Sequence, residues 1–293
     1  MFINQLNNFI VWKALVPKFL RTKLWKLFLR KEIIKSFKKS EDKEIIEVLN
    51  FLKKNELRIF PYNFIFKYKE QEIEVHFDEY INLKFVYLNK TKKLFFKKRW
   101  SKSRIRKAFN QLLIEQDPLS PHRYLTKDFN VNENSIVADI GCAEANFSLD
   151  IIDKVKHIYL FEANNIWDKP LKSTFEKYKD KVTIVNKKLS NYDSDYTIDA
   201  DKFFKEKEIN FLKIDVDGNE EEVMSGLANT IEKSTQMQIA LCTYHAQNDY
   251  IKYSEYFKKR NYKVEVSNGY TVFLWDKNLT FPYLRRGLIR AKK

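Results

Sequence analysis

The sequence is poor in cysteine and lacks long apolar runs. Its 293 residues include two cysteines, Cys142 and Cys242, which excludes a disulfide framework and predicts two buried, unreactive thiols. No apolar run reaches the roughly 18 residues that a membrane-spanning helix needs, and no small-residue cleavage site follows Phe9–Val16. We therefore expect a cytoplasmic protein that is either free or peripheral to the inner face of the cytoplasmic membrane.

Glycine is also scarce, and one of the five glycines, Gly141, ends an apolar run that contains Asp139. This pattern predicts a buried strand that breaks sharply into a turn and then a helix. In an open parallel sheet, such a turn presents backbone N–H groups to a nucleotide-like cofactor. A second apolar strand, His157–Phe161, ends at Glu162, which lies 21 residues after Gly141. At this spacing a carboxylate accepts hydrogen bonds from ribose hydroxyls; the alternative is a solvated loop carboxylate.

A third strand, Phe211–Ile214, ends in a cluster of acidic residues at Asp215, Asp217 and Glu220. Like charges this close repel, so a fold accommodates them mainly where a cation or a hydrogen-bond donor joins them. A further apolar strand, Met237–Cys242, is followed by Thr243, Tyr244 and His245. We expect His245 to lie beside the acids at the same edge of the sheet.

Three segments, taken in order and spacing, resemble the FkbM family of S-adenosylmethionine-dependent methyltransferases. They are DIGCAEANFS from Asp139, FEAN from Phe161 and KIDVDGNEEEVMSG from Lys213, and the third is the most specific. The resemblance covers about Pro121 to the C-terminus. It implies an α/β fold with a Rossmann-like seven-stranded sheet, and O-methyl transfer to a sugar hydroxyl of a bacterial surface glycan or its lipid-linked precursor. One departure is Ala145, where the family usually has glycine.

At this edge of the predicted sheet, the expected cofactor contacts and the candidate base are different residues. We expect the cofactor S-adenosylmethionine to contact a set of residues at or after the ends of four strands: Asp139, Gly141, Cys142, Ala143, Glu144, Asn146, Glu162, Ala163, Leu189, Ser190 and Asp215. His245 is the candidate general base because histidine titrates near neutral pH, and Asp217 is expected to orient it. In a second mechanism Asp215 or Asp217 holds Mg²⁺ or Ca²⁺ together with His245; the metal-free version is favoured.

The C-terminal part argues against a nicotinamide-dependent oxidoreductase. The runs Tyr262–Val266 and Thr271–Trp275 flank Asn268 and Gly269 and predict an antiparallel hairpin. Such a hairpin at the edge of a parallel sheet resembles the methyltransferase arrangement. A dinucleotide turn normally needs three glycines in GxGxxG, of which this turn has Gly141 alone.

Positive charge is concentrated in the N-terminal part of the chain. Residues 1–130 hold 29 Lys and Arg against 14 Asp and Glu, whereas residues 131–293 hold 25 of each. Composition divides the chain into a basic helical segment (1–56), a β-rich accessory subdomain (57–120) and the methyltransferase domain (121–293). Residues 19–37 predict a basic amphipathic helix, and residues 57–100 predict an antiparallel meander.

The basic residues indicate an anionic partner. Residues 90–107 carry ten basic residues and no acid, which suits an anionic glycan or glycolipid substrate, or an anionic leaflet reached through 19–37 and 90–107. Aromatic residues lie beside these basic residues in the sequence, so RNA is an alternative partner. The strand end at Asp215, however, lacks the Asn/Asp-Pro-Pro-aromatic motif of base-methylating enzymes. The alternatives to the glycan enzyme are thus an RNA methyltransferase, or a non-catalytic membrane- or RNA-binding protein with this fold.

Loop residues Pro121–Tyr124 are expected either to cover the acceptor site or to pack on the sheet edge.

Overall fold

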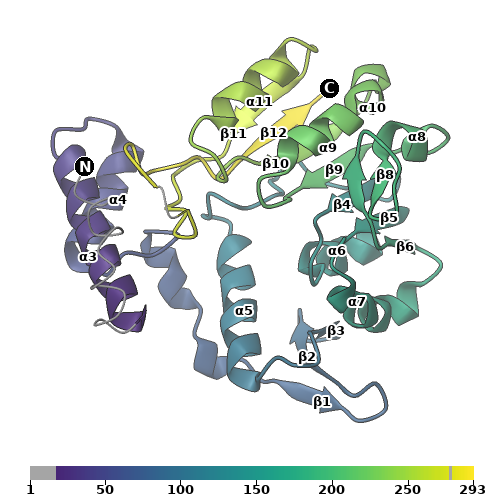
Figure 1. Cartoon of the computed structure of the whole chain (residues 1–293), viewed down its shortest axis with the longest axis horizontal. Helices are drawn as coiled ribbons and strands as arrows, with labels where there is room; N and C mark the ends of the chain where they lie inside the picture. Colours follow the sequence, from purple (N-terminus) through teal and green to yellow (C-terminus); the bar gives the residue numbers. More distant parts are fainter. Residues whose placement is uncertain (1–17, 277–278) are drawn as a thin grey trace. The chain divides into compact units, whose positions relative to one another are not determined.

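The computed structural model describes residues 18–276 and 279–293, which form two compact units (Figure 1). One unit contains the described residues up to Asn63 together with Gly269–Arg285, and the other contains Phe64–Asn268 and Arg286–Lys293. The three-part division expected from composition stays a prediction. None of the helices in the described ranges is both long enough and apolar enough to cross a membrane.

A seven-stranded sheet forms the centre of the second unit. Its strands lie in the order β11-β12-β10-β9-β4-β5-β6. Their bounds are β4 Ile136–Ile140, β5 His157–Phe161, β6 Val182–Val185, β9 Phe211–Ile214, β10 Gln238–Cys242, β11 Lys263–Val266 and β12 Leu288–Lys292. Five central strands pair in parallel, while β12 runs antiparallel to both β10 and β11. The expected α/β fold with a Rossmann-like seven-stranded sheet is therefore confirmed.

Alternating side chains of the strands fill two cores, one on each face of the sheet. Val137, Leu160 and Phe211 join the core beneath α6 and α7, whereas Ala138 and Leu212 join the core beneath α8–α11. Figure 1 shows α6 and α7 on the opposite side of the sheet from α9, α10 and α11. The helix bounds are α6 Asn146–Ile151, α7 Asp168–Phe175, α8 Ala200–Phe204, α9 Glu220–Gly226, α10 Ala228–Lys233 and α11 Asp249–Lys258.

A second, smaller sheet packs against the α6 and α7 side. It is a three-stranded antiparallel meander of β1 His76–Asp78, β2 Leu83–Leu88 and β3 Lys92–Phe95. The backbone N–H of Phe95 donates to Thr174 Oγ1 of α7 at 3.1 Å, and Lys92 Nζ donates to Leu149 O of α6 at 3.0 Å. Helix α5, Lys102–Glu115, follows the meander and leads toward the main sheet.

The meander is shorter than the sequence indicated. Residues 76–95 form it as expected, but the aromatic stretch before them forms two 3₁₀ turns, η1 Asn63–Lys67 and η2 Glu70–Glu72. Aromatic side chains alone therefore did not determine strand structure in residues 57–72.

The remaining short elements are three 3₁₀ turns and a two-stranded parallel ladder. The turns are η3 Ile152–Lys154, η4 Asn165–Trp167 and η5 Glu176–Tyr178, and the ladder pairs β7 Lys188–Ser190 with β8 Thr197–Asp199.

The predicted C-terminal hairpin is wrong in its second strand. β11 pairs with β12, Leu288–Lys292, rather than with Thr271–Trp275. Thr271 forms only an isolated bridge with Arg285, and Gly269–Arg285 belongs to the first unit. The antiparallel edge exists as expected, but a long excursion separates its two strands.

The first unit contains α3, Lys18–Ser36, and α4, Lys43–Lys54. The basic helix expected at 19–37 is thus present. Leu29 and Ile33 of α3 are fully buried, whereas Leu24 and Leu27 are exposed. Arg30 Nε also donates to Leu52 O of α4 at 2.5 Å. The helix therefore uses part of its apolar surface against its own unit and leaves two leucines in solvent.

Candidate active site

The turn after β4 is shaped by backbone contacts that require glycine. Gly141 has φ +74°, and a Cβ placed on it would lie 2.0 Å from the backbone oxygen of Asp215. Ala143 and Ala145 also have positive φ, at 47° and 59°, so Ala145 adopts the backbone conformation that a glycine would adopt without strain. The turn therefore lies directly against the end of β9.

This turn lies where the order of the strands reverses. β5 and β6 extend the sheet on one side of β4, and β9 and β10 extend it on the other. In open α/β sheets, ligands bind outside the carboxyl ends of the strands at such a switch point. The expected cofactor turn is thus at the position where this architecture places a ligand.

Asp139 has a buried ionic partner that organises the turn. Its carboxylate lies 2.9 Å from Lys213 Nζ and accepts the Ser148 hydroxyl at 2.7 Å. Lys213 Nζ also donates to Gly141 O at 2.8 Å. Burial alone would lower the pKa of Lys213, but Asp139 and Asp215 outweigh it and raise that pKa. Asp139 was expected to touch the cofactor; its contacts in the structure hold β4, β9 and α6 together.

Glu162 lies beside the turn, as its spacing predicted. Its two carboxylate oxygens accept the backbone N–H groups of Ala143 at 3.0 Å and Asn164 at 2.7 Å. Each oxygen keeps lone pairs for another donor, and Glu162 is only partly buried. A cofactor ribose fits this donor–acceptor set, and the carboxyl groups of Glu162 and Asp215 at this edge suit a positively charged sulfonium.

The other expected cofactor contacts divide by exposure. Glu144, Asn146 and Ala163 are partly or fully exposed, and burial raises the pKa of Glu144 to about 7. Cys142 is buried and burial raises the pKa of its thiol, as expected of an unreactive cysteine. Leu189 and Ser190 are enclosed by protein, and the Ser190 hydroxyl donates to Glu222 Oε1 at 2.8 Å. A ligand would have to meet the backbone of these two residues.

Asp215 is the centre of a hydrogen-bonded cluster at the carboxyl end of β9. Its Oδ1 accepts the Tyr244 hydroxyl at 2.8 Å, and its Oδ2 accepts the Tyr124 hydroxyl at 3.1 Å. His122 Nε2 lies 3.7 Å from Oδ2, and its burial lowers the pKa of this imidazole to about 4. Burial would raise the pKa of Asp215, but Lys213, His122 and His245 outweigh it and lower that pKa to about 2.

His245 lies beside this cluster, as expected, but its nearest carboxylate is Glu220. Its Nδ1 lies 2.7 Å from Glu220 Oε1, and Glu220 is buried. Its Nε2 lies 3.5 Å from Asp217 Oδ1, on a side chain that is fully solvent-exposed, and 3.8 Å from Asp215 Oδ1. Burial would lower the pKa of His245, but Asp217, Glu220 and Asp215 raise it to about 10. Glu220 rather than Asp217 is therefore positioned to orient the ring.

The metal set suggested by the sequence is not the one that the structure brings together. Within residues 18–276 and 279–293, one trio of metal-ligand atoms from different side chains converges to within 4.8 Å, and it consists of His122, Asp215 and Cys242. His245 and Asp217, the expected partners for Mg²⁺ or Ca²⁺, are not part of it. Asp249, which follows His245 by four residues, instead accepts the backbone N–H of Ala246 at 2.9 Å.

Several contributors to the cluster were missed from the sequence. Tyr124 and His122 belong to the loop for which packing on the sheet edge was an open alternative, and the structure brings both to Asp215 instead. Tyr244 was noted only as a neighbour of His245, and Lys213 only as part of a motif. The strand period of two could have indicated that Lys213 and Asp215 share a face with Asp139 on the next strand.

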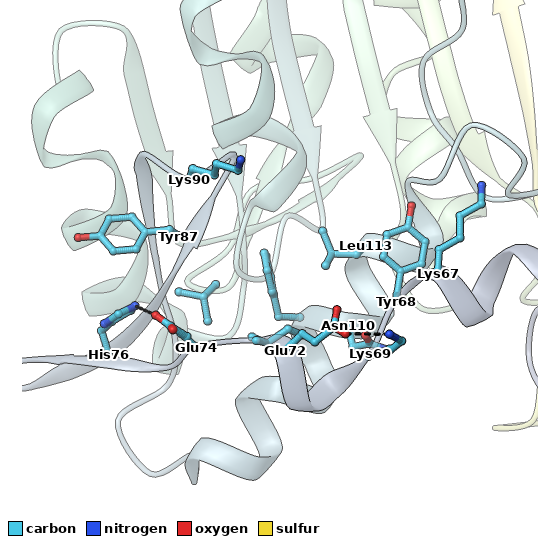
Figure 2. A pocket seen from close by; sticks show the side chains of 13 residues that line it. Lys67, Tyr68, Lys69, Glu72, Glu74, His76, Tyr87, Lys90, Asn110 and Leu113 are labelled. Atoms are coloured by element: carbon cyan, nitrogen blue, oxygen red, sulfur yellow. Dashed lines mark hydrogen bonds and ion pairs between the residues drawn. The ribbon is translucent and has the colours of Figure 1, made fainter.

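Two neighbouring cavities lie between α5, the small sheet and the 3₁₀ turns. One has a volume of about 340 Å³ and is lined by Lys67, Tyr68, His76, Tyr87, Lys90 and Asn110, among others (Figure 2). The second, of about 280 Å³, shares Tyr68, Phe109 and Leu113 with the first and reaches Asn146 and Phe147 at the start of α6. Together they lead from the basic accessory region to the helix that follows the cofactor turn.

Comparison with known proteins found several solved structures that are similar to part of this chain. Among solved structures, an FkbM methyltransferase from Methylobacillus flagellatus KT is 14% identical, with a TM-score of 0.43 over 55% of this chain and 44% of its own. A precorrin-6y C5,15-methyltransferase from Geobacter metallireducens GS-15 is 16% identical, with a TM-score of 0.40 over 56% and 84%. M. capricolum TrmK, solved with S-adenosyl-homocysteine, is 15% identical, with a TM-score of 0.35 over 58% and 67%.

The chain thus spans less than half the length of the first of these structures. No curated protein matches the sequence. The family model of the FkbM methyltransferase domain matches residues 89–264, which is more than half of the chain. The chain therefore belongs to the FkbM methyltransferase family, and S-adenosylmethionine stays the expected methyl donor.

Proposed function

We propose that this protein transfers a methyl group to a sugar hydroxyl of a bacterial surface glycan or its lipid-linked precursor. The observation that carries the proposal is the cluster around Asp215, where a carboxylate, two tyrosine hydroxyls and an imidazole converge within hydrogen-bonding or ion-pair distance at the end of β9. These groups suit a hydroxyl acceptor, because they can both accept its proton and donate to its oxygen.

The chemistry asks little of the protein beyond alignment. The bound cofactor supplies an activated methyl group on a sulfonium. The acceptor oxygen forms the new C–O bond as the methyl–sulfur bond breaks and its electron pair returns to sulfur, and the hydroxyl proton leaves. Asp215, held at both oxygens by Tyr124 and Tyr244, orients the acceptor hydroxyl. A 1 Å displacement of such a positioning group can reduce the rate by about 100-fold.

The His245–Glu220 pair is the candidate proton acceptor. Glu220 Oε1 lies 2.7 Å from Nδ1, which orients the ring so that Nε2 faces Asp215 and Asp217. An imidazole held at one nitrogen by a buried carboxylate can take a proton at the other when the ring is neutral. Because the pKa of His245 is about 10, the neutral ring becomes more populated as pH rises, so we expect the methyl-transfer rate to increase toward pH 10. In this arrangement the exposed Asp217 adds negative charge near the imidazole of His245 but does not fix the orientation of the ring.

The two cavities beside α5 support a sugar-containing acceptor. Their walls offer the tyrosines Tyr68 and Tyr87, the amide of Asn110 and the amines of Lys67 and Lys90. Aromatic faces and amide groups suit sugar rings, and the amines suit a phosphate or carboxylate on the same molecule. We place the remote part of the acceptor there.

Four of the ten basic residues at 90–107 are available for an anionic surface. Lys92, Lys93 and Arg106 make hydrogen bonds within the protein, and Lys97 and Arg104 lie over tryptophan rings. Lys98, Arg99, Lys102 and Lys107 are exposed. Peripheral contact with an anionic membrane is proposed through these four residues and α3, where each basic residue near the surface contributes about 1 kcal/mol.

The proposal is tested with a radiolabelled methyl donor and a panel of lipid-linked and free bacterial glycans, with structured RNA as the competing acceptor. We expect label in a glycan, and a rate at least about 100-fold lower in Asp215→Asn and in Glu220→Gln. Glu133→Gln, at an exposed position outside the site, is the matched control. Label in RNA but in no glycan would support the RNA methyltransferase instead, and label in neither would contradict the proposed acceptor.

A further inference from the structure

His122, Asp215 and Cys242 form a buried trio that the methyl-transfer chemistry above does not use as a set. We propose that these three side chains bind a zinc-class divalent transition metal and leave a fourth coordination position open toward the acceptor. Catalytic zinc sites typically have this composition of three protein ligands and one exchangeable position.

The distances between the ligand atoms suit such an ion. Tetrahedral bonds of about 2.3 Å to sulfur and about 2.0–2.1 Å to nitrogen and oxygen separate a sulfur–nitrogen pair by about 3.5 Å and a nitrogen–oxygen pair by about 3.3–3.4 Å. Here His122 Nε2 lies 3.5 Å from Cys242 Sγ and 3.7 Å from Asp215 Oδ2. The third pair, Cys242 Sγ and an Asp215 carboxylate oxygen, lies within 4.8 Å, so a movement of the Asp215 carboxylate toward the other two ligands would complete the geometry.

The three ligands come from elements that are held in place. Asp215 follows β9 directly and Cys242 is the last residue of β10, so both stand at carboxyl ends of adjacent strands. His122 lies on a loop whose next two carbonyls, those of Arg123 and Tyr124, accept hydrogen bonds from the buried Arg290 of β12. A preformed set of ligands needs little reorganisation when an ion binds.

The surroundings of the trio resemble a metal site more than a simple hydrogen-bonded cluster. Tyr124 and Tyr244 each donate to one oxygen of Asp215, which fixes the carboxylate as outer-shell partners of a metal ligand do. His122 and Cys242 are almost fully buried, whereas the Asp215 side chain is 18% exposed. The open coordination position would therefore lie on the Asp215 side.

The ligand types favour a zinc-class metal over Mg²⁺ and Ca²⁺. Thiolate and imidazole prefer zinc and cobalt, whereas magnesium and calcium prefer oxygen ligands. Binding exchanges the thiol proton of Cys242 for the metal, and that proton passes to solvent. If the proposed methyl transfer holds, the acceptor hydroxyl occupies the fourth position, where the ion makes its proton easier to lose; this last step alone rests on the proposed function.

Cobalt(II) spectroscopy of the full chain tests the metal site without requiring activity. Purified protein is stripped with a chelator, titrated with Co²⁺ and examined for thiolate-to-cobalt charge-transfer absorption. The chain offers a matched control because it has two cysteines: in Cys142→Ser the sole remaining thiol is Cys242. We expect one equivalent of Co²⁺ with charge-transfer absorption in the wild type and in Cys142→Ser, displaced by Zn²⁺.

Cys242→Ser should lose the charge-transfer absorption, and His122→Ala should weaken Co²⁺ binding by at least tenfold. Circular dichroism identifies a variant that has not folded. If Cys242→Ser or His122→Ala has not folded, the Co²⁺ titration of Cys142→Ser tests the metal site by itself, because this variant keeps all three ligands. No charge-transfer absorption in folded Cys142→Ser, or its persistence in folded Cys242→Ser, would overturn the proposal. Either result leaves methyl transfer to glycans to be judged by its own assay.

Discussion

At the scale of single residues, two glycines with similar backbone angles have different requirements. Gly141 and Gly218 have φ of +74° and +88°, but a Cβ on Gly141 would meet the backbone of Asp215, whereas nothing lies within 4 Å of a Cβ on Gly218. Gly218→Ala should therefore cost only the strain of the left-handed conformation, about 1–2 kcal/mol. Gly141→Ala should cost more than about 4 kcal/mol or prevent folding.

Urea unfolding of the two glycine variants measures this difference directly. A similar loss of unfolding free energy in both would show that the close approach of Asp215 to the turn does not exist. We also expect Gly218→Ala to retain cofactor binding and Gly141→Ala to lose it.

Single residues also mark where sequence reasoning succeeded and where it could not. The places of Glu162 and His245 were predictable, because each follows a strand whose period and length are visible in the sequence. The contact of Tyr124 with Asp215 joins residues 91 positions apart. No local pattern encodes such a contact, since it depends on how the loop before β4 crosses the finished sheet.

At the scale of secondary-structure elements, one buried ion pair joins the two central strands. Asp139 and Lys213 are direct neighbours in the β4–β9 register, and their side chains are 1% and 5% exposed. Removing one partner leaves the other charge unpaired in the core, so Lys213→Met should lower the unfolding free energy by about 3–5 kcal/mol. The double variant Asp139→Asn/Lys213→Met should lose markedly less than the sum of the single variants.

A double-mutant cycle in urea checks this coupling. Lys202→Met, which removes a solvent-exposed partner of Asp193, is the matched control and should change stability far less. Strict additivity of the Asp139 and Lys213 variants would contradict the role given to the pair.

The same scale explains the errors in the predicted elements. Asn268 and Gly269 form a strong hairpin signal between two β-rich runs, yet the partner of β11 is β12, some twenty residues further along. Sequence favours the nearer partner because short connections are common. It cannot show that Gly269–Arg285 instead packs with α4 and its flanking residues, where Gly269 N donates to Glu44 Oε1 at 2.6 Å.

At the scale of the whole molecule, one half-buried carboxyl group, that of Glu115, should make stability depend on pH. Burial raises the pKa of Glu115, at the end of α5, from 4.5 to about 8, despite a hydrogen bond from Gln111 and the charge of Lys213; Asp215 and Glu144 raise it further. The folded state thus holds this proton more tightly than the unfolded state does. The stabilisation is complete below pH 4.5 and is lost as pH rises through 8.

Glu115→Gln should therefore be more stable than the wild type at pH 9, by a few kcal/mol at about 1.4 kcal/mol per unit of pKa, and similar to it at pH 4.5. Urea unfolding at both pH values measures the difference, with Glu133→Gln as an exposed control. A difference between Glu115→Gln and wild type that is the same at both pH values would contradict the half-buried, proton-retaining carboxyl.

The whole-molecule features were predictable to different degrees. The seven-stranded sheet was implied by the resemblance to the FkbM family, which rests on short motifs at the ends of three strands. The sequence shows that the N-terminal region is basic. It cannot separate the charges used within the protein, such as those of Lys92 and Arg106, from those in solvent, such as that of Lys98. That division depends on which carbonyls and rings the fold brings within reach.

Calorimetric titration of S-adenosylmethionine and its demethylated product into the purified protein tests the central claim, that the edge formed by β4, β5 and β9 is a methyl-donor site. Wild type should bind with micromolar affinity, and Glu162→Ala at least tenfold more weakly, because it loses a charged hydrogen-bond acceptor beside the turn. Glu162→Gln, which keeps an oxygen for Ala143 N–H, should fall between them. No binding by the wild type, or equal binding by Glu162→Ala, would contradict the account.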